Sequence, residues 1–120
     1  MTPSAERGTK PITGSAFYIL LALADGPRHG LGIIEDIERR TEGAVGLGPG
    51  TLYHAIRKLE STGLIVESAE RPVPELDDPR RRYYSITDKG REIVTREAAR
   101  LDRILQVARS KDLLPRSGSA

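Results

Sequence analysis

The chain has 120 residues, with 19 lysines and arginines against 17 aspartates and glutamates, a net charge of +2 and a pI near 9.1. This weak basicity does not by itself indicate nucleic-acid binding. A hydrophobic content of 38% allows one small domain with additional segments. The absence of cysteine excludes disulfides and thiolate metal sites and fits a reducing compartment.

No targeting or membrane segment is visible in the sequence. The first twelve residues are polar and lack the apolar stretch of a signal peptide. The longest apolar run, Ala16 to Ala24, is too short to span a bilayer. We therefore expect no membrane partner and a cytoplasmic protein.

The N-terminal part predicts a disordered tail over residues 1–12, followed by a domain over residues 13–87. A first helix is expected from Thr13-Gly14-Ser15 to Leu23, with Asp25-Gly26-Pro27 ending it, because glycine and proline interrupt helices. His29 then stands at the start of a second helix, where we expect it to cap or pack.

The second helix is expected from about Gly30 to Glu42, with one apolar face. Ile33, Ile34 and Ile37 are predicted to face the core. The charged residues are predicted to face solvent: Glu35, Asp36, Glu38, Arg39 and Arg40.

A third helix, beginning at Pro49, has two unlike faces. Proline suits the first turn, where its missing N–H has no partner to lose. At about 100° per residue, Leu52, Ile56 and Leu59 fall on one arc. The opposite arc has polar and cationic side chains and no carboxylate: Gly50, Thr51, Tyr53, His54, Arg57, Lys58 and Ser61. Such a surface is typical of a helix that enters the major groove of DNA.

Two strands joined by a polar loop follow this helix and predict the wing of a winged helix. Gly63 closes the helix, the first strand covers Leu64–Ser68, and the second covers Arg82–Ile86. Tyr83 and Tyr84 should point to opposite faces of the second strand, with one of them in the core.

Consecutive arginines lead into the second strand, and Arg80, Arg81 and Arg82 are candidate DNA contacts. Two basic clusters, one on each side of a single strand, favour a nucleic-acid surface over ordinary solvation. The alternative for Arg82 is an ion pair with Asp77 or Glu75.

A long final helix is predicted over residues 88–114, with Thr87 as its N-cap and Asp88 at the positive end of its dipole. At about 40 Å for about 27 residues, it exceeds what a small winged-helix body can cover. We expect its heptad-like apolar stripe to be buried in a homodimer. The stripe, called here the dimer seam, comprises Val94, Ala98, Leu101, Ile104, Leu105 and Ala108. The alternative is a helix that folds back on its own domain. Residues 115–120 predict a second disordered tail.

Several local sequences match the order of elements in one family. They are Gly26-Pro-Arg-His-Gly30, the Ile33-Ile34 and Ile37 helix, Pro49-Gly-Thr-Leu-Tyr53, Leu59-Glu60 with Gly63-Leu-Ile65, Arg82-Tyr-Tyr84 and Thr87-Asp-Lys-Gly90. Together they resemble the PadR family of transcriptional regulators, in its short form with a single C-terminal helix. The resemblance covers Ser15 to Leu114.

This resemblance implies an α+β, mainly α fold: a winged helix-turn-helix with a long C-terminal dimerisation helix. It implies a homodimer that binds double-stranded DNA at a palindromic operator, often as a repressor released by a signal through the dimer. Tyr53 would contact the DNA backbone, and Arg57 and Lys58 would reach phosphates or bases. A small-molecule effector is compatible with this mechanism but is not identified by the sequence.

The chain also departs from the family pattern. Gly48 stands where relatives often have serine, and Leu31 where they often have tyrosine. Acidic residues in the wing would be repelled by phosphate, which argues against DNA contact by the wing tip. The chain has no tryptophan on which a flat aromatic drug could stack.

Other functions are less well supported. The glycines from Gly43 to Gly50 lack the lysine–serine/threonine pair of a phosphate-binding loop. The histidines and carboxylates show no metal-ligand spacing. We therefore expect no enzymatic activity, no metal and no cofactor. The second hypothesis is a winged-helix dimer that acts as a protein-interaction adaptor without binding DNA.

Overall fold

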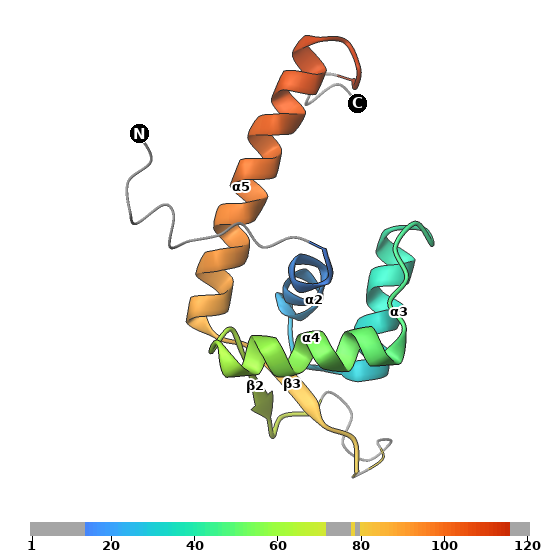
Figure 1. The fold of residues 1–120 in the computed structure, drawn as a ribbon, viewed down its shortest axis with the longest axis vertical. Helices are drawn as coiled ribbons and strands as arrows, with labels where there is room; N and C mark the ends of the chain where they lie inside the picture. The colour runs from blue at the N-terminus through green and yellow to red at the C-terminus, as the bar shows by residue number, and fades with distance from the viewer. Residues whose placement is uncertain (1–13, 72–77, 79, 116–120) are drawn as a thin grey trace.

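A computed structural model of the chain describes residues 14–71, 78 and 80–115. The elements, in chain order, are α2 (Ser15–Leu23), β1 (Arg28–His29), α3 (Gly30–Arg40), α4 (Pro49–Ser61), β2 (Ile65–Ser68), β3 (Tyr83–Ile86) and α5 (Asp88–Ser110) (Figure 1). The two predicted tails lie outside the described residues, apart from Pro115, as do Glu75 and Asp77 in the wing loop.

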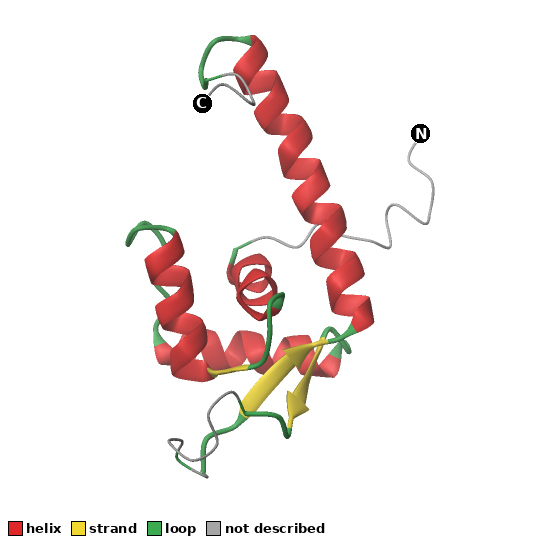
Figure 2. Ribbon diagram, turned by 180° about the vertical axis from the view of Figure 1, so that it is seen from behind, coloured by secondary structure: helices red, strands yellow, loops and turns green. Residues whose placement is uncertain are grey.

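A small antiparallel sheet joins the helices, with strand order β1-β3-β2. Ile65 pairs with Ile86 in β2 and β3, and Arg28 pairs with Tyr84 in β1 and β3. The sheet lies at the opposite end of the molecule from the C-terminal end of α5 (Figure 2). The two wing strands were predicted, whereas β1 was not, because two residues are too few to show an alternating pattern.

The core lies around α2, which contacts α3, α4 and α5 (Figure 1). The apolar arc of the third helix is buried as predicted, since Leu52, Ile56 and Leu59 are at most 4% exposed. Each fully buried leucine or isoleucine stabilises the fold by about 1.5–3 kcal/mol relative to an exposed one. The buried arc therefore fixes which face of α4 points to solvent.

Asp36 corrects the prediction for the second helix, because it is 3% exposed and not on the solvent face. Its carboxylate lies 3.3 Å from the guanidinium of Arg28, 2.7 Å from that of Arg39 and 3.2 Å from that of Arg40. A buried carboxylate is tolerated where it is paired and hydrogen-bonded. One partner, Arg28, comes from β1, the strand that the sequence pattern did not reveal.

Glycine or aspartate in the left-handed region ends two helices. After α4, Gly63 has φ 79°, and the N–H of Leu64 donates to the carbonyl of Leu59. After α5, Asp112 has φ 63°, and the N–H of Leu113 donates to the carbonyl of Ala108. Both are Schellman motifs. The second explains why α5 ends at Ser110, earlier than the predicted Leu114.

Both tyrosines of β3 are buried, so the prediction that one would be in the core was incomplete. Tyr84 is 5% exposed and belongs to the main core cluster. Tyr83 is 6% exposed and is covered by polar groups. Its ring lies edge-on to that of His29 at 5.2 Å, and the guanidinium of Arg71 lies 4.9 Å from its centroid.

Candidate nucleic-acid interface

The polar face of α4 is the first part of the candidate interface. Every residue predicted on it is exposed: Gly50, Thr51, Tyr53, His54, Arg57, Lys58 and Ser61. The helix lies across the molecule with its apolar face on the core (Figure 1). A straight helix anchored in this way can present its outer face to a groove of DNA.

Arg57 and Lys58 provide the charge on this face. Neither side chain forms an ion pair with any residue that the structure describes. Their neighbours on the arc are hydroxyl groups, imidazole and glycine, and the exposed carboxylate of Glu60 lies at its edge, three positions after Arg57. Both cations are therefore available to phosphate oxygens or base edges without the loss of an ion pair to any described residue.

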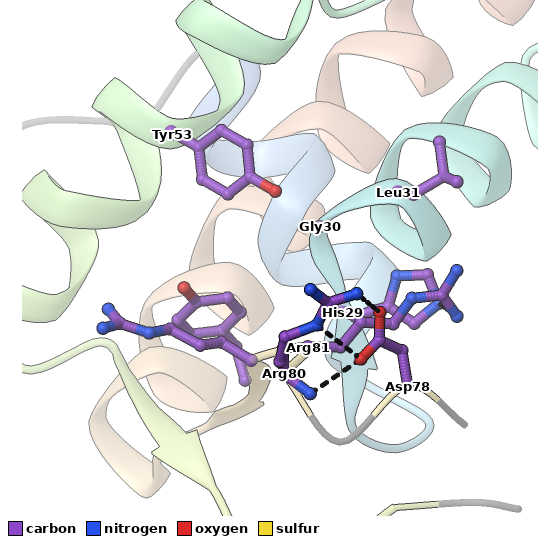
Figure 3. Close-up of a pocket in the computed structure, with 9 residues that line it drawn as sticks. His29, Gly30, Leu31, Tyr53, Asp78, Arg80 and Arg81 are labelled. Atoms are coloured by element: carbon purple, nitrogen blue, oxygen red, sulfur yellow. Dashed lines mark hydrogen bonds and ion pairs between the residues drawn. The ribbon is translucent and has the colours of Figure 1, made fainter.

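Tyr53 lies at the inner edge of the same face and is 44% exposed. Its ring reaches across to the start of α3, with the hydroxyl over Gly30 (Figure 3). A Cβ atom added to Gly30 would lie 2.6 Å from this hydroxyl oxygen. Glycine at position 30 therefore lets the half-exposed hydroxyl of Tyr53 lie over the start of α3, where a larger residue would push the ring aside.

His29 connects the start of α3 with the wing. Its Nδ1 accepts a hydrogen bond from the backbone N–H of Gly32 at 3.1 Å, which confirms the expected capping role. Its Nε2 lies 3.3 Å from Nη1 of Arg81. The side chain thus lies at the base of the wing, between α3 and the consecutive arginines.

The arginines of the wing differ in their surroundings. Arg80 is held by Asp78, which accepts from the backbone N–H at 2.9 Å and from the guanidinium at 3.2 Å (Figure 3). The same hydrogen bonds lower the pKa of the Asp78 carboxyl below its usual value. Arg81 lies against His29. Arg82 is exposed and forms no ion pair with the described residues.

Arg71 fixes the described end of the wing loop. Its guanidinium donates to the carbonyl oxygens of Asp78 at 3.2 Å and of Arg81 at 2.6 Å. The sequence pattern gave no signal for this role, because Arg71 is far along the chain from its acceptors. The effect is to bring the charged residues 80–82 back toward the sheet.

An open pocket of about 570 Å³ lies between α4, the start of α3 and the wing. Tyr53 lines it from α4, His29 from β1, Gly30 and Leu31 from α3, and Asp78 with residues 80–82 from the wing (Figure 3). The structure therefore brings Tyr53 of the polar face of α4 together with the predicted arginine cluster of the wing, whereas Arg57 and Lys58 do not line this pocket. Leu31 and Asp78 were not predicted as part of this surface.

The predicted dimer seam lies along α5, and only part of it is exposed. Val94 is buried in the core of its own chain, so the surface available to a partner begins after it. Ala98 is exposed, and Leu101 and Ala108 are half-buried. Ile104 is 50% and Leu105 is 42% exposed. The C-terminal half of α5 projects beyond the other elements (Figure 1).

The described part of the chain contains neither a metal-binding cluster nor a membrane-spanning helix. Residues 14–71, 78 and 80–115 contain no group of three or more histidine, aspartate or glutamate side chains placed to hold a metal. Within the same ranges, no helix is long and apolar enough to cross a membrane.

Known proteins with similar sequences include one transcriptional regulator and one uncharacterised protein. A protein of 37.1 kDa in a transposon of Streptomyces fradiae is 41% identical over 86 residues, which are 72% of this chain and 22% of that protein. This chain thus spans only a small part of that relative. The transcriptional regulator Rv3488 of Mycobacterium tuberculosis is 33% identical over 87 residues, covering 72% of this chain and 75% of the regulator.

The fold is also found among solved structures. A transcriptional regulator from Clostridium thermocellum superposes with a TM-score of 0.65 and 24% identity, covering 92% of this chain and 96% of that one.

The sequence model of the transcriptional regulator PadR-like family matches residues 19–96. This range runs from α2 into α5 and includes the whole described surface of α4 and the wing.

These findings confirm the resemblance and the fold class predicted from the sequence, a winged helix-turn-helix with a C-terminal helix. They also agree with the expectation that the protein is not an enzyme, since the family consists of transcriptional regulators. The chain belongs to the PadR-like family of transcriptional regulators.

Proposed function

We propose that this regulator binds a palindromic DNA operator as a homodimer and represses transcription. The observation that carries the proposal is the outer face of α4, where Arg57 and Lys58 are exposed and have no ion-pair partner among the described residues. Hydroxyl groups and an imidazole lie beside them on this face, with Glu60 at its edge. Cations of this kind bind phosphates and can read guanine in the major groove.

The pocket between α4 and the wing supports a division of roles. Arg57 and Lys58 would enter the major groove with α4. The hydroxyl of Tyr53 and the guanidinium of Arg82 would hold the sugar–phosphate backbone beside it. Arg80 would contribute less, because its charge is already matched by Asp78 at 3.2 Å. Contacts to phosphate would fix the register, and contacts to bases would supply the specificity.

The exposed apolar side chains of α5 support dimerisation. Ile104, Leu105 and Val107 are 50%, 42% and 53% exposed. On a projecting helix, these side chains would be buried by the same stripe of a second copy. Leu21 on α2, which is 45% exposed, would extend the contact. Two copies of α4 would then enter successive major grooves about 34 Å apart.

Release by a signal would act through the same dimer. A ligand that changes the angle between the two α5 helices changes the separation of the two α4 helices and therefore the affinity for the operator. The effector is an unidentified small molecule in this proposal.

A gel-shift titration of the purified protein against the DNA that flanks its own gene tests the proposal. It would be run at low and at physiological salt, with competitor DNA. A discrete shift that resists competitor and has dimer stoichiometry would support it. Binding should also weaken with salt, with a slope of about 0.9 per phosphate contact. A failure to bind at either salt would instead favour the adaptor hypothesis, which a pull-down would pursue.

A further inference from the structure

The end of α4 and the start of α5 meet in a dense polar contact that no DNA-contacting role explains. We call it the α4–α5 joint, and it comprises residues 62–64 after α4 and residues 87–90 at the start of α5. The two segments are separated in the chain by the whole wing, yet they lie side by side (Figure 1).

Consecutive carbonyl oxygens on the α4 side each accept a hydrogen bond from the α5 side. The carbonyl of Thr62 accepts from Nζ of Lys89 at 3.1 Å. The carbonyl of Gly63 accepts from the hydroxyl of Thr87 at 2.7 Å. The carbonyl of Leu64 accepts from the backbone N–H of Thr87 at 3.1 Å. Backbone carbonyls at a helix C-terminus need such partners, and a cation there also matches the helix dipole.

Thr87 serves both sides of the joint with one hydroxyl group. Its Oγ1 donates to Gly63 and accepts from the backbone N–H of Gly90 at 3.0 Å, which caps α5. Gly90 is buried, and a Cβ atom there would collide with the carbonyl oxygen of Leu64. Any larger residue would therefore push α5 away from the end of α4.

Further contacts leave α5 little freedom to turn relative to α4. Arg91 donates to the carbonyl of Ala24 at 3.0 Å, which ties the first turn of α5 to the end of α2. Ile65 and Ile86 are paired at the base of the wing, directly beside the joint. The two described strands of the wing thus begin and end at the joint.

We propose that the α4–α5 joint makes the recognition helix and the dimerisation helix one rigid body, and that Thr87 is the positioning residue in it. The inference rests on the proposed function, because it assigns a role to α4 within a DNA-bound dimer. A rigid joint transmits any rotation of α5 directly to α4. It therefore makes the dimer selective for the spacing of the two half-sites.

The rigidity can be measured without DNA. Spin labels at Glu60→Cys on α4 and Arg103→Cys on α5 are practical, because the chain has no other cysteine. Diluting the labelled chain with excess unlabelled chain restricts the signal to distances within one protomer. We expect a narrow distance distribution in the parent protein and in Thr87→Ser, which keeps the hydroxyl. Thr87→Val, which has nearly the same shape but no hydroxyl, should broaden it. An equally narrow distribution in a folded Thr87→Val protein would overturn the proposal.

The functional consequence is tested on operators obtained by selection with the purified protein. One added base pair between the half-sites rotates them by about 34° and separates them by about 3.4 Å. The parent protein and Thr87→Ser should lose about tenfold in affinity on this insertion. Thr87→Val should lose less than about threefold, while its affinity for an isolated half-site stays unchanged. An equal loss for all three proteins would contradict the proposal.

Failure of the proposed function and failure of the rigid joint give different experimental results. If the parent protein binds neither operator nor half-site, the proposed function fails, whereas the spin-label result still decides whether the joint is rigid. If Thr87→Val does not fold, Lys89→Met removes the single bond to Thr62 and is measured in the same way. If Lys89→Met then has the same spin-label distance distribution and the same preference for half-site spacing as the parent protein, the proposal of a rigid joint is contradicted.

Discussion

The two helices of the helix-turn-helix, α3 and α4, both carry exposed cations, yet they use them differently. On α3, Arg39 and Arg40 are paired with the buried carboxylate of Asp36 at 2.7 Å and 3.2 Å. On α4, Arg57 and Lys58 have no carboxylate partner among the described residues. A similar contrast recurs among the described residues of the wing, where Arg80 is paired with Asp78 and Arg82 forms no ion pair. A basic side chain is thus available to DNA according to its neighbours and not according to its charge alone.

The largest expected effect comes from separating the two copies of α4. Ile104→Asp places a charge on the exposed apolar part of α5 and should give a monomer. Loss of the second binding site typically costs about 10²- to 10⁴-fold in affinity. Light scattering and operator titration measure both effects. Gln106→Asp, on a different face of α5, serves as the control. An Ile104→Asp protein that remains dimeric would contradict the proposal that the dimer seam of α5 holds the two copies together.

The ion pairs of α3 should matter for stability and not for DNA. Asp36→Ala removes the carboxylate that faces Arg28, Arg39 and Arg40, and should lower the free energy of unfolding by about 1–3 kcal/mol. Glu35→Ala, an exposed neighbour, should change it by less than about 0.5 kcal/mol. Urea denaturation of both variants gives the comparison. Equal stabilities would mean that the network contributes nothing.

The sequence predicted α4 correctly because its features are local. Leu52, Ile56 and Leu59 repeat with the helical period, and Gly63 occupies the left-handed position that ends the helix. The capping role of Thr87 was likewise visible from its position before a polar first turn. Its hydrogen bond to Gly63, 24 positions away, was not.

The errors share one cause, which is that contacts between distant parts of the chain leave no periodic signal. Asp36 was assigned to the solvent face because its partner Arg28 lies in an unrecognised strand. Tyr83 was not recognised as buried because His29 and Arg71 cover it from elsewhere in the sequence. Arg80 is the exception, because its partner Asp78 is only two positions away and the sequence pattern did not show that the two side chains would pair. The DNA-contacting and dimer-forming roles of the named residues remain predictions.

A base contact by α4 should give an intermediate effect. Arg57→Ala should cost about 1–3 kcal/mol of binding free energy on the operator and relax the sequence preference at one position. Arg39→Ala, which removes an equal charge from α3, should leave the affinity unchanged. Titrations of both variants against operators with single base changes measure the affinity and the sequence preference. A uniform loss on all sequences would mark Arg57 as a phosphate contact instead.

The wing arginines should differ by a smaller amount. Arg82→Ala should reduce the slope of log affinity against log salt by about one, as loss of one phosphate contact does. Arg80→Ala should change it less. The pKa of Asp78 is lowered by Arg80, so this pairing is present above the usual carboxyl pKa and is lost only as the pH falls through the lowered value. If Arg80→Ala and Arg82→Ala have equal salt slopes near pH 7, the proposed difference between the two arginines in phosphate contact is wrong.

The smallest effect concerns Tyr84. Burial, and secondarily the charge of Glu60, raise its pKa above 10.0, while Arg82 opposes the shift. A raised tyrosine pKa contributes stability below the ordinary value, and this contribution is lost as the pH rises through the raised one. Arg82→Ala should therefore move the titration of Tyr84 to still higher pH, and Arg80→Ala should not. Ultraviolet difference spectra against Tyr84→Phe identify the transition. Identical titrations would mean that the charge of Arg82 does not reach Tyr84.

The central claim is that the exposed cations of α4, Arg57 and Lys58, form the DNA contact, and one titration tests it most directly. Labelled operator is titrated with the parent protein, with Arg57→Ala/Lys58→Ala, and with Arg96→Ala/Arg103→Ala, which removes the same charge from the exposed surface of α5. The account predicts that the α4 variant loses operator binding and most of its salt dependence, while the α5 variant binds like the parent. Equal losses in the two variants would show that only net charge matters and would contradict the account.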